Sequence, residues 1–217
     1  MSTSRFDPGE QRYWAAVVPL PGALLSSLAK QAEAQGLHGL FATQVHGAPF
    51  STLAAAAVGT RRIELATGIA IASTRSPFET AMTAMDLDRI SEGRFVLGLG
   101  ASSLSWTRGM HGVPVSKPLT HLKETVCAVR HIVANAHKGL EPFEGEYYRA
   151  DFEEFQATSP PVRERIPIWT AALRERAVRV AGEVSDGLIG HPIWSVDWAE
   201  QMVGTELAKG LDQSGRT

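Results

Sequence analysis

Three of the chain's histidines follow apolar segments at places where the chain turns, and they are the first candidates for chemistry. His46 comes after a short apolar run, His111 lies in a longer loop, and His191 follows an Asp-Gly turn and another apolar run. An imidazole gains or loses a proton near neutral pH, so each could polarise a carbonyl group or move a proton. We take His46 as the catalytic candidate and assign His111 and His191 to a substrate pocket, with a loop position of no function as the alternative for each.

A second candidate site is a stretch of small residues that follows a strongly apolar run. Residues 86–100 read D-L-D-R-I-S-E-G-R-F-V-L-G-L-G. The run at 94–99 lacks polar alternation, which is typical of a parallel strand buried on both faces. The small residues at 100–103 would let a flat ligand or a phosphate approach the backbone.

Other kinds of site find no support in the spacing of residues. No cluster of His, Cys, Asp or Glu has the spacing of metal ligands, and no G-x-S-x-G turn presents a nucleophilic serine. Asp86 and Asp88 lie late in an expected helix, and we expect them to pair with Arg89 or Arg94. Arg75 precedes a helix start, where it could bind a phosphate or carboxylate or pair with a nearby acid.

Alternating strands and helices are expected to position these residues. Strand-length apolar runs occur at 13–18, 37–43, 62–72, 94–99, 166–170 and 188–190. Helical patterns occur at 24–35, 49–58, 77–90, 118–136, 174–184 and 196–209, with Gly210 closing the last. Ser76-Pro77-Phe78-Glu79 is a capping box with proline at the first helical position. Strict alternation predicts parallel strands joined by right-handed crossovers.

Two architectures show this alternation, an open doubly wound sheet and a (β/α)₈ barrel. The first strand is followed by P-L-P-G and not by the G-x-G-x-x-G of a dinucleotide-binding sheet. The candidate residues instead follow several different strands, as they do in barrels. We therefore predict an α/β fold of the TIM (β/α)₈ type, forming a single domain over 1–217 and lacking the last two βα units.

The composition is that of a globular protein and argues against several classes of function. The 217 residues are 44% hydrophobic with a net charge of −2, enough for one core and without the basic excess that nucleic-acid binding needs. No apolar stretch approaches the roughly 20 residues of a membrane span, and the first ten residues lack a signal-peptide core. The single cysteine, Cys127, excludes an intrachain disulfide and fits the cytoplasm. Cys127 lies on an apolar helix face, so we expect it to be buried.

Four segments together resemble the bacterial-luciferase-like superfamily. They are I-E-L-A-T-G-I-A-I-A-S-T-R-S-P at 63–77, S-E-G-R-F-V-L-G-L-G-A-S at 91–102, F-E-G-E-Y-Y at 143–148 and A-G-E-V-S-D-G-L-I-G-H-P at 181–192. The resemblance runs through nearly the whole chain in the family's order. The branch it resembles most uses the deazaflavin coenzyme F-420.

The resemblance implies a barrel, often dimeric, that holds a flavin-type ring at the carboxyl ends of its strands. It implies a non-proline cis peptide within 68–70, in a bulge of the third strand that supports the ring. The cofactor-binding residues it implies are Thr67, Gly68, Ile69, Ala70, Gly100, Ala101, Ser102, Thr170, Ala171, Ala172 and Arg174. The chain departs from the family pattern at Leu173 and Arg174, where a glycine is usual, and at Gln44 and Ala48, where acidic residues are usual.

For function, the resemblance implies an oxidoreductase that uses reduced F-420 to transfer hydride to or from a small organic substrate, in a cytoplasmic homodimer. An FMN-dependent luciferase-like monooxygenase is the alternative, because the residues near Arg174 do not distinguish the short phosphate tail of FMN from the longer polyanionic tail of F-420. A second alternative is a non-catalytic flavin-binding protein or partner subunit with an incomplete barrel. No metal, nucleic-acid or membrane partner is expected.

Overall fold

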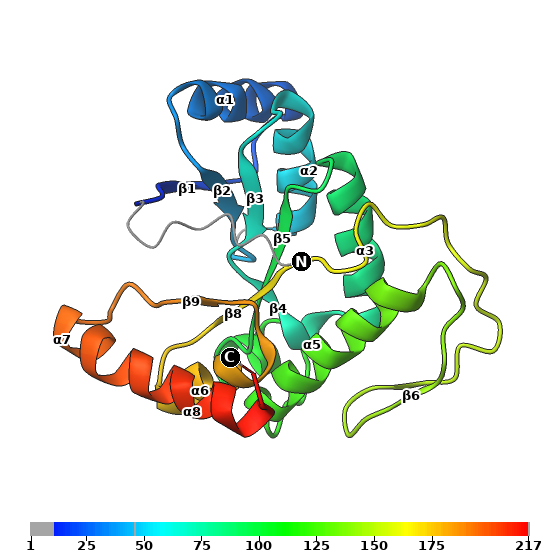
Figure 1. The fold of residues 1–217 in the computed structure, drawn as a ribbon. Coiled ribbons are helices and arrows are strands. Elements are labelled where there is room, and N and C mark those ends of the chain that lie inside the picture. Colours follow the sequence, from blue (N-terminus) through cyan, green and yellow to red (C-terminus); the bar gives the residue numbers. More distant parts are fainter. Residues whose placement is uncertain (1–10, 46, 217) are drawn as a thin grey trace.

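Six parallel strands curl into the wall of an open barrel (Figure 1). The structure is a computed structural model and describes residues 11–45 and 47–216. In spatial order the strands are β1 (Trp14–Val17), β2 (Gly39–Ala42), β3 (Glu64–Thr67), β5 (Phe95–Gly100), β8 (Ile168–Ala171) and β9 (Gly187–Ile189). Each neighbouring pair is parallel, and spatial order follows chain order. This is the strand order of a TIM barrel, so the predicted alternation and direction of the strands are confirmed.

Helices cover the outer face of this wall (Figure 1). They are α1 (Gly22–Ala34), α2 (Pro49–Gly59), α3 (Pro77–Ile90), α5 (Pro118–Asn135), α6 (Glu175–Val184) and α8 (Gly204–Ser214). The Ser76 hydroxyl accepts a hydrogen bond from the Glu79 N–H at 3.0 Å, which confirms the predicted helix start, with Ser76 as the N-cap and Pro77 at the first helical position of α3. Two features were not predicted from the sequence: the short helix α4 (Leu104–Gly109) and the hairpin of β6 (Phe143–Glu144) and β7 (Arg149–Ala150).

The helix expected at 196–209 has a different form. Helix α7 (Val196–Trp198) leads through a π-helical segment, η2 (Ala199–Val203), into α8, which ends at Gly215 in the left-handed conformation. Gly210 therefore does not close the helix. A Cβ at Gly210 would lie 2.1 Å from the Arg179 carbonyl oxygen, so this glycine instead allows α6 and α8 to approach closely.

The third strand, expected as one run over 62–72, is broken. Strand β3 ends at Thr67, the Gly68–Ile69 peptide is cis, and β4 (Ala70–Ile71) then pairs with β5. A 3₁₀ turn, η1 (Ala72–Thr74), follows. The predicted non-proline cis peptide within 68–70 is confirmed. The residues on both sides of the break are apolar, so hydropathy alone predicts a continuous strand.

Two tryptophans fill part of the barrel interior. Trp14 of β1 and Trp169 of β8 meet with ring centroids 5.4 Å apart, although three strands separate β1 from β8 in the sheet. Each ring lies over a glycine of the next strand, since a Cβ would come within 2.3 Å of Trp14 at Gly39 and within 2.5 Å of Trp169 at Gly187. The wall is therefore curved strongly enough for distant strands to touch.

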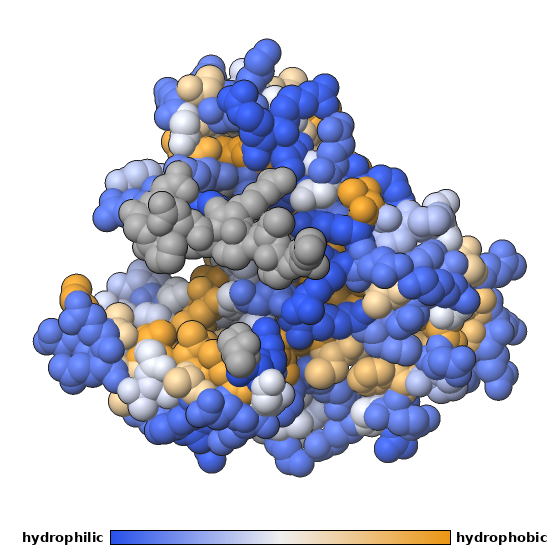
Figure 2. All heavy atoms as spheres, in the orientation of Figure 1, coloured by the Kyte–Doolittle hydropathy of each residue, from blue (hydrophilic) through white to orange (hydrophobic). Residues whose placement is uncertain are grey.

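Over the part of the chain that the structure describes, the barrel wall ends at β1 on one side and at β9 on the other. Exposed apolar side chains flank both, namely Tyr13 and Val18 beside β1, and Ile193 and Val196 after β9. Figure 2 shows apolar side chains exposed over the region of α6 to α8. In a closed eight-stranded barrel, two further βα units would occupy this sector.

Buried polar contacts fix how the loops enter the strands. Asp88 is 1% exposed and accepts hydrogen bonds from the Arg163 guanidinium, which also donates to the Phe95 carbonyl. The expected pairing of Asp86 with Arg89 is confirmed at 3.3 Å.

Arg94 pairs with neither aspartate. Its guanidinium donates to the carbonyl groups of Ala57, Thr60, Ile63 and Ser91, so it joins α2, β3 and α3 at the amino ends of the strands.

The expected burial of Cys127 is wrong, because Cys127 is exposed. The buried stripe of α5 includes Leu122, Val126, Val129 and Val133. Cys127 follows Val126 directly, and one residue turns a helix by about 100°, which places it beside the stripe.

We expect Asp88→Ala to destabilise the fold by about 3 kcal/mol, because it leaves the Arg163 charge without its partner. The matched control is Asp86→Ala, two residues away on the same helix, whose exposed ion pair should contribute less than about 1 kcal/mol. Urea unfolding of the three proteins measures both changes. Equal effects of the two substitutions would contradict this view of the Asp88 pair.

We expect Glu33 to make the fold sensitive to acid. Its Oε2 accepts hydrogen bonds from the backbone N–H groups of Arg61, Arg62 and Ile63 at 3.0, 2.6 and 2.9 Å. Burial raises the pKa of Glu33, but these donors outweigh burial and hold the pKa below its usual value. The unfolded chain therefore takes up a proton first as pH falls, and the stabilisation by Glu33 is lost below about pH 4.5.

Unfolding measured from neutral pH down to about pH 3 tests this. The difference in unfolding free energy between the native chain and Glu33→Gln should shrink as pH falls. The control is Glu92→Gln, whose side chain is exposed, and its difference should stay near zero. A gap between the native chain and Glu33→Gln that does not change with pH would refute the role of the charge.

Candidate functional site

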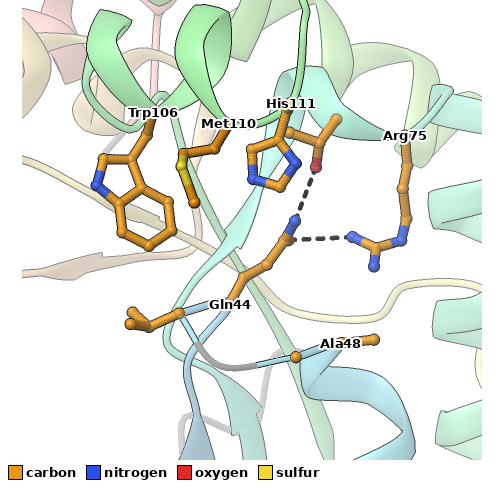
Figure 3. Close-up of a pocket in the computed structure, with 9 residues that line it drawn as sticks. Gln44, Ala48, Arg75, Trp106, Met110 and His111 are labelled. Carbon is orange, nitrogen blue, oxygen red and sulfur yellow. Dashed lines mark hydrogen bonds between the residues drawn. The ribbon is translucent and has the colours of Figure 1, made fainter.

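A pocket of about 360 Å³ lies where the segments after β2, β4 and β5 meet (Figure 3). The loop from β2 to α2 supplies one wall, the turn before α3 a second, and α4 with the residue pair after it a third. The lining residues are Gln44, Val45, Gly47, Ala48, Thr74, Arg75, Trp106, Met110 and His111. The carboxyl ends of parallel strands meet at one edge of a barrel, where barrel enzymes hold their substrates.

Gln44 ties together the segments that form this pocket. Its backbone N–H donates to the Ile69 carbonyl at 3.1 Å, and its Oε1 accepts from the Ile71 N–H at 2.9 Å. Its Nε2 donates to Thr74 Oγ1 at 2.9 Å, and Oε1 also accepts from Arg75 Nη1 at 3.0 Å. Gln44 therefore joins the end of β2 to the break in the third strand through its backbone, and to β4 and the turn before α3 through its side chain. Sequence reasoning noted Gln44 only as a replacement for an acid and missed this role.

Arg75 places a cation at the pocket wall. Its guanidinium bonds to Gln44 and lies 5.4 Å from the centre of the Phe50 ring. Within residues 11–45 and 47–216, no carboxylate forms an ion pair with Arg75. Of the two alternatives for this residue, pairing with an acid is therefore wrong for the described chain. Binding of an anionic ligand stays a prediction.

The residues expected to hold a cofactor converge beside this pocket. Ala70 of β4 pairs with Leu99 of β5, and Leu99 pairs with Thr170 of β8, so the three strand ends lie side by side. Gly68, Ile69, Ala101 and Ala171 are half-buried there, and Ser102 is exposed with a φ of 58°. Together they form a surface of backbone and mostly small side chains.

The two threonines in this set use their side chains within the protein. Thr67 Oγ1 donates to the Gly98 carbonyl at 2.7 Å and accepts from the Gly98 N–H at 2.8 Å. Thr170 Oγ1 shares a hydrogen bond of 2.6 Å with Ser185 Oγ. Both are fully buried. The Thr67 side chain joins β3 to β5 and the Thr170 side chain joins β8 to the end of α6, so a ligand at this edge would meet the backbone.

Strand β8, which pairs with the side of β5 opposite to β4, leads into α6. The Ala172 N–H donates to the Ile189 carbonyl at 3.1 Å, so it is already used within the sheet. Arg174 is the exposed N-cap residue of α6 and makes no side-chain capping bond. Exposed Arg176 lies in the first turn of the same helix. Both arginines follow Thr170, Ala171 and Ala172, which the family resemblance assigns to cofactor binding.

His111 and His191 do not lie together. His111 lines the pocket (Figure 3). His191 lies after β9, exposed, and its Nδ1 accepts from the Ile193 N–H at 3.3 Å, so it is not part of this pocket. His46 falls outside the described residues. The pocket also contains Trp106 and Met110, which the spacing of apolar residues did not single out because α4 was not predicted.

Metal binding and membrane insertion can be assessed for residues 11–45 and 47–216. No group of three or more His, Cys, Asp and Glu side chains there is arranged to hold a metal ion. No helix there is both long enough and apolar enough to span a bilayer.

Comparison with known proteins identifies the family. The family model for luciferase-like monooxygenases matches residues 10–217. A Mycobacterium tuberculosis protein, provisionally named a coenzyme F-420-dependent oxidoreductase, is 32% identical over 94% of this chain and 59% of its own length. The F-420-dependent tetrahydromethanopterin reductase of Methanopyrus kandleri has a TM-score of 0.76 at 23% identity, over 96% of this chain and 63% of that one.

A third similar protein has a different cofactor. The oxygenating constituent of 3,6-diketocamphane monooxygenase from Pseudomonas putida, in complex with FMN, also has a TM-score of 0.76, at 20% identity. Its match covers 95% of this chain and 64% of that chain. The chain thus spans about three fifths of the length of the relatives it matches.

These matches define the class of protein. The fold is the luciferase-like TIM barrel, described here through six of its strands. The chain belongs to the luciferase-like monooxygenase family, whose members named above are oxidoreductases. The resemblance carried by the four sequence segments is confirmed.

We expect Gly98→Ala to destabilise the protein by about 2 kcal/mol through overpacking. A Cβ at Gly98 would lie 1.8 Å from the Thr67 carbonyl oxygen, so the backbone of β3 or β5 must move. Gly109→Ala is the control, because a Cβ there has no neighbour within 4 Å. Chemical denaturation of both variants measures the change. An unaltered stability of Gly98→Ala would show that the two strands are not held this closely.

Proposed function

We propose that this chain serves an oxidoreductase reaction in which coenzyme F-420 exchanges hydride with a small organic substrate. The observation that carries the proposal is family membership with 32% identity, over 94% of this chain, to a protein provisionally named an F-420-dependent oxidoreductase. Because that relative is substantially longer than the matched region, the activity of a whole enzyme is part of the proposal.

The residues at the strand ends fit a planar tricyclic ring. Gly68, Ile69, Ala101 and Ala171 present backbone and mostly small side chains, half-buried, at the carboxyl edge of the wall. Such a surface lets a flat ring approach the main chain closely. Bound there, F-420 would supply a hydride donor or acceptor, which no side chain can provide.

The chain's own residues would orient the reactants. Gln44 fixes the position of the strand break that would support the ring. Trp106 and Met110 would shield the substrate from water, and His111 would hold or move a proton beside it. The exposed Arg174 and Arg176 suit the polyanionic tail of F-420 at the start of α6, where the free backbone N–H groups also favour an anion.

The alternative is an FMN-dependent monooxygenase. The likeness to the FMN-bound monooxygenase supports the fold at 20% identity and leaves the cofactor open. FMN has a single phosphate, so it needs fewer cationic partners than F-420. The number of arginines that contribute to binding therefore distinguishes the two cofactors.

Separate titrations with F-420 and FMN, followed by fluorescence, test the proposal. We expect F-420 to bind at least about tenfold more tightly than FMN. The double variant Arg174→Gln/Arg176→Gln should lose about tenfold or more in F-420 affinity, because charge-assisted hydrogen bonds to the tail are removed. The control is Arg89→Gln, at the far end of α3, which should bind F-420 like the native chain.

Other results would point to the alternatives. Tighter binding of FMN, with oxygen consumption when reduced FMN is supplied, would favour the monooxygenase. Binding of either cofactor without turnover over a substrate panel would favour a non-catalytic flavin-binding protein or partner subunit.

A further inference from the structure

The Arg75 guanidinium, in the pocket at the carboxyl edge, is held in place by neighbouring side chains. Gln44 Oε1 accepts from Arg75 Nη1 at 3.0 Å, and the guanidinium lies 5.4 Å from the Phe50 ring centre. Gln44 is itself fixed by Ile71 and Thr74, so the guanidinium is positioned by a network that does not neutralise it. Among residues 11–45 and 47–216, no carboxylate forms an ion pair with Arg75.

The remaining groups of the pocket add no negative charge. Its lining residues are apolar, neutral or basic. Helix α2 begins at the same wall, and its N-cap, Ala48, has no side chain to cap the first turn. The amino end of a helix carries partial positive charge, so it reinforces the potential set by Arg75.

An apolar wall faces this cation. Trp106 and Met110, on and after α4, lie across the pocket from Arg75 in Figure 3, and the apolar Val45 also lines the pocket. A ligand that fills the pocket would therefore meet apolar surface at one end and a guanidinium at the other. Planar guanidinium groups bind carboxylates with two parallel hydrogen bonds, which makes arginine selective for them.

The pocket and the start of α6 lie on opposite sides of β5. Arg75 follows β4, which pairs with one side of β5, whereas Arg174 follows β8, which pairs with the other side. The surface assigned to the ring lies between them. If the cofactor tail binds at Arg174, Arg75 stays available to bind the substrate.

We propose that the substrate of this chain is an organic acid, whose carboxylate binds Arg75 and whose apolar part lies against Trp106 and Met110. That the ligand is a substrate rests on the proposed function. That the ligand is a carboxylate with an apolar part rests on the pocket alone. Arg75 then selects among substrates, and Gln44 is the positioning residue that aims it.

Two probes that differ only in charge test the inference, 4-phenylbutyrate and 4-phenylbutanamide. Their affinities are measured by calorimetry with the full chain, with and without saturating F-420. We expect the carboxylate to bind at least about tenfold more tightly than the amide. Arg75→Gln should remove this difference while the amide binds as before, which shows that the pocket is intact. Arg75→Lys should keep part of the difference, and the control Arg89→Gln should keep all of it.

The outcomes separate this inference from the proposed function. Carboxylate preference that depends on Arg75 supports the inference even if neither F-420 nor FMN binds. Equal affinities of the two probes in the native chain overturn it, even if F-420 binds tightly. A loss of F-420 affinity in Arg75→Gln, with the carboxylate preference unchanged, also overturns it, because Arg75 would then serve the cofactor.

Discussion

The side-chain amide of Gln44 joins segments that the chain order separates by about 30 residues, and the geometry of the site depends on it. Its donors and acceptors reach Ile71, Thr74 and Arg75, and its backbone N–H reaches Ile69. A neutral amide can donate and accept at once, whereas a carboxylate at this position could only accept. The amide can therefore bond to the Thr74 hydroxyl and to Arg75 without cancelling the charge of Arg75. The loop after β2, the broken third strand and the start of α3 thus form one unit.

This unit divides the carboxyl edge of the barrel into regions with different chemistry. The ends of β4, β5 and β8 present backbone and mostly small side chains, which suits a flat ring. The segments after β2, β4 and β5 add an apolar wall and a cation, and the segment after β8 adds exposed arginines. Parallel strands bring these regions to the same edge because every crossover returns the chain to the same end of the sheet. At the opposite end, Arg94 and Asp88 use their polar atoms to hold loops and helices in place.

Close backbone packing sets limits that hydropathy does not reveal. Gly98 and Gly210 both stand where a Cβ would collide with a carbonyl oxygen, one between β3 and β5 and the other between α6 and α8. In the sequence, Gly98 reads as part of a small-residue strand end and Gly210 as a helix stop. In the structure, both permit contact between elements far apart in the chain. Cys127 shows the converse, because a helix face that is apolar overall still has an exposed border.

The sequence by itself determined the alternation of strands and helices, the parallel barrel type, the capped start of α3 and the family. The strands, helices and capped helix start follow from local periodicity and from turn and capping residues. The family follows from short segments, each of which can be compared with the family's own sequence. It also identified the small residues at the strand ends, because lack of bulk is visible in the residue types.

Only the tertiary structure decided which polar groups meet. It paired Asp88 with Arg163 from a distant loop, bonded Arg75 to Gln44, brought His111 to the pocket and left His191 outside it. Hydrogen bonds act over about 3 Å and depend on direction, so they are set by how the elements pack and not by spacing along the chain.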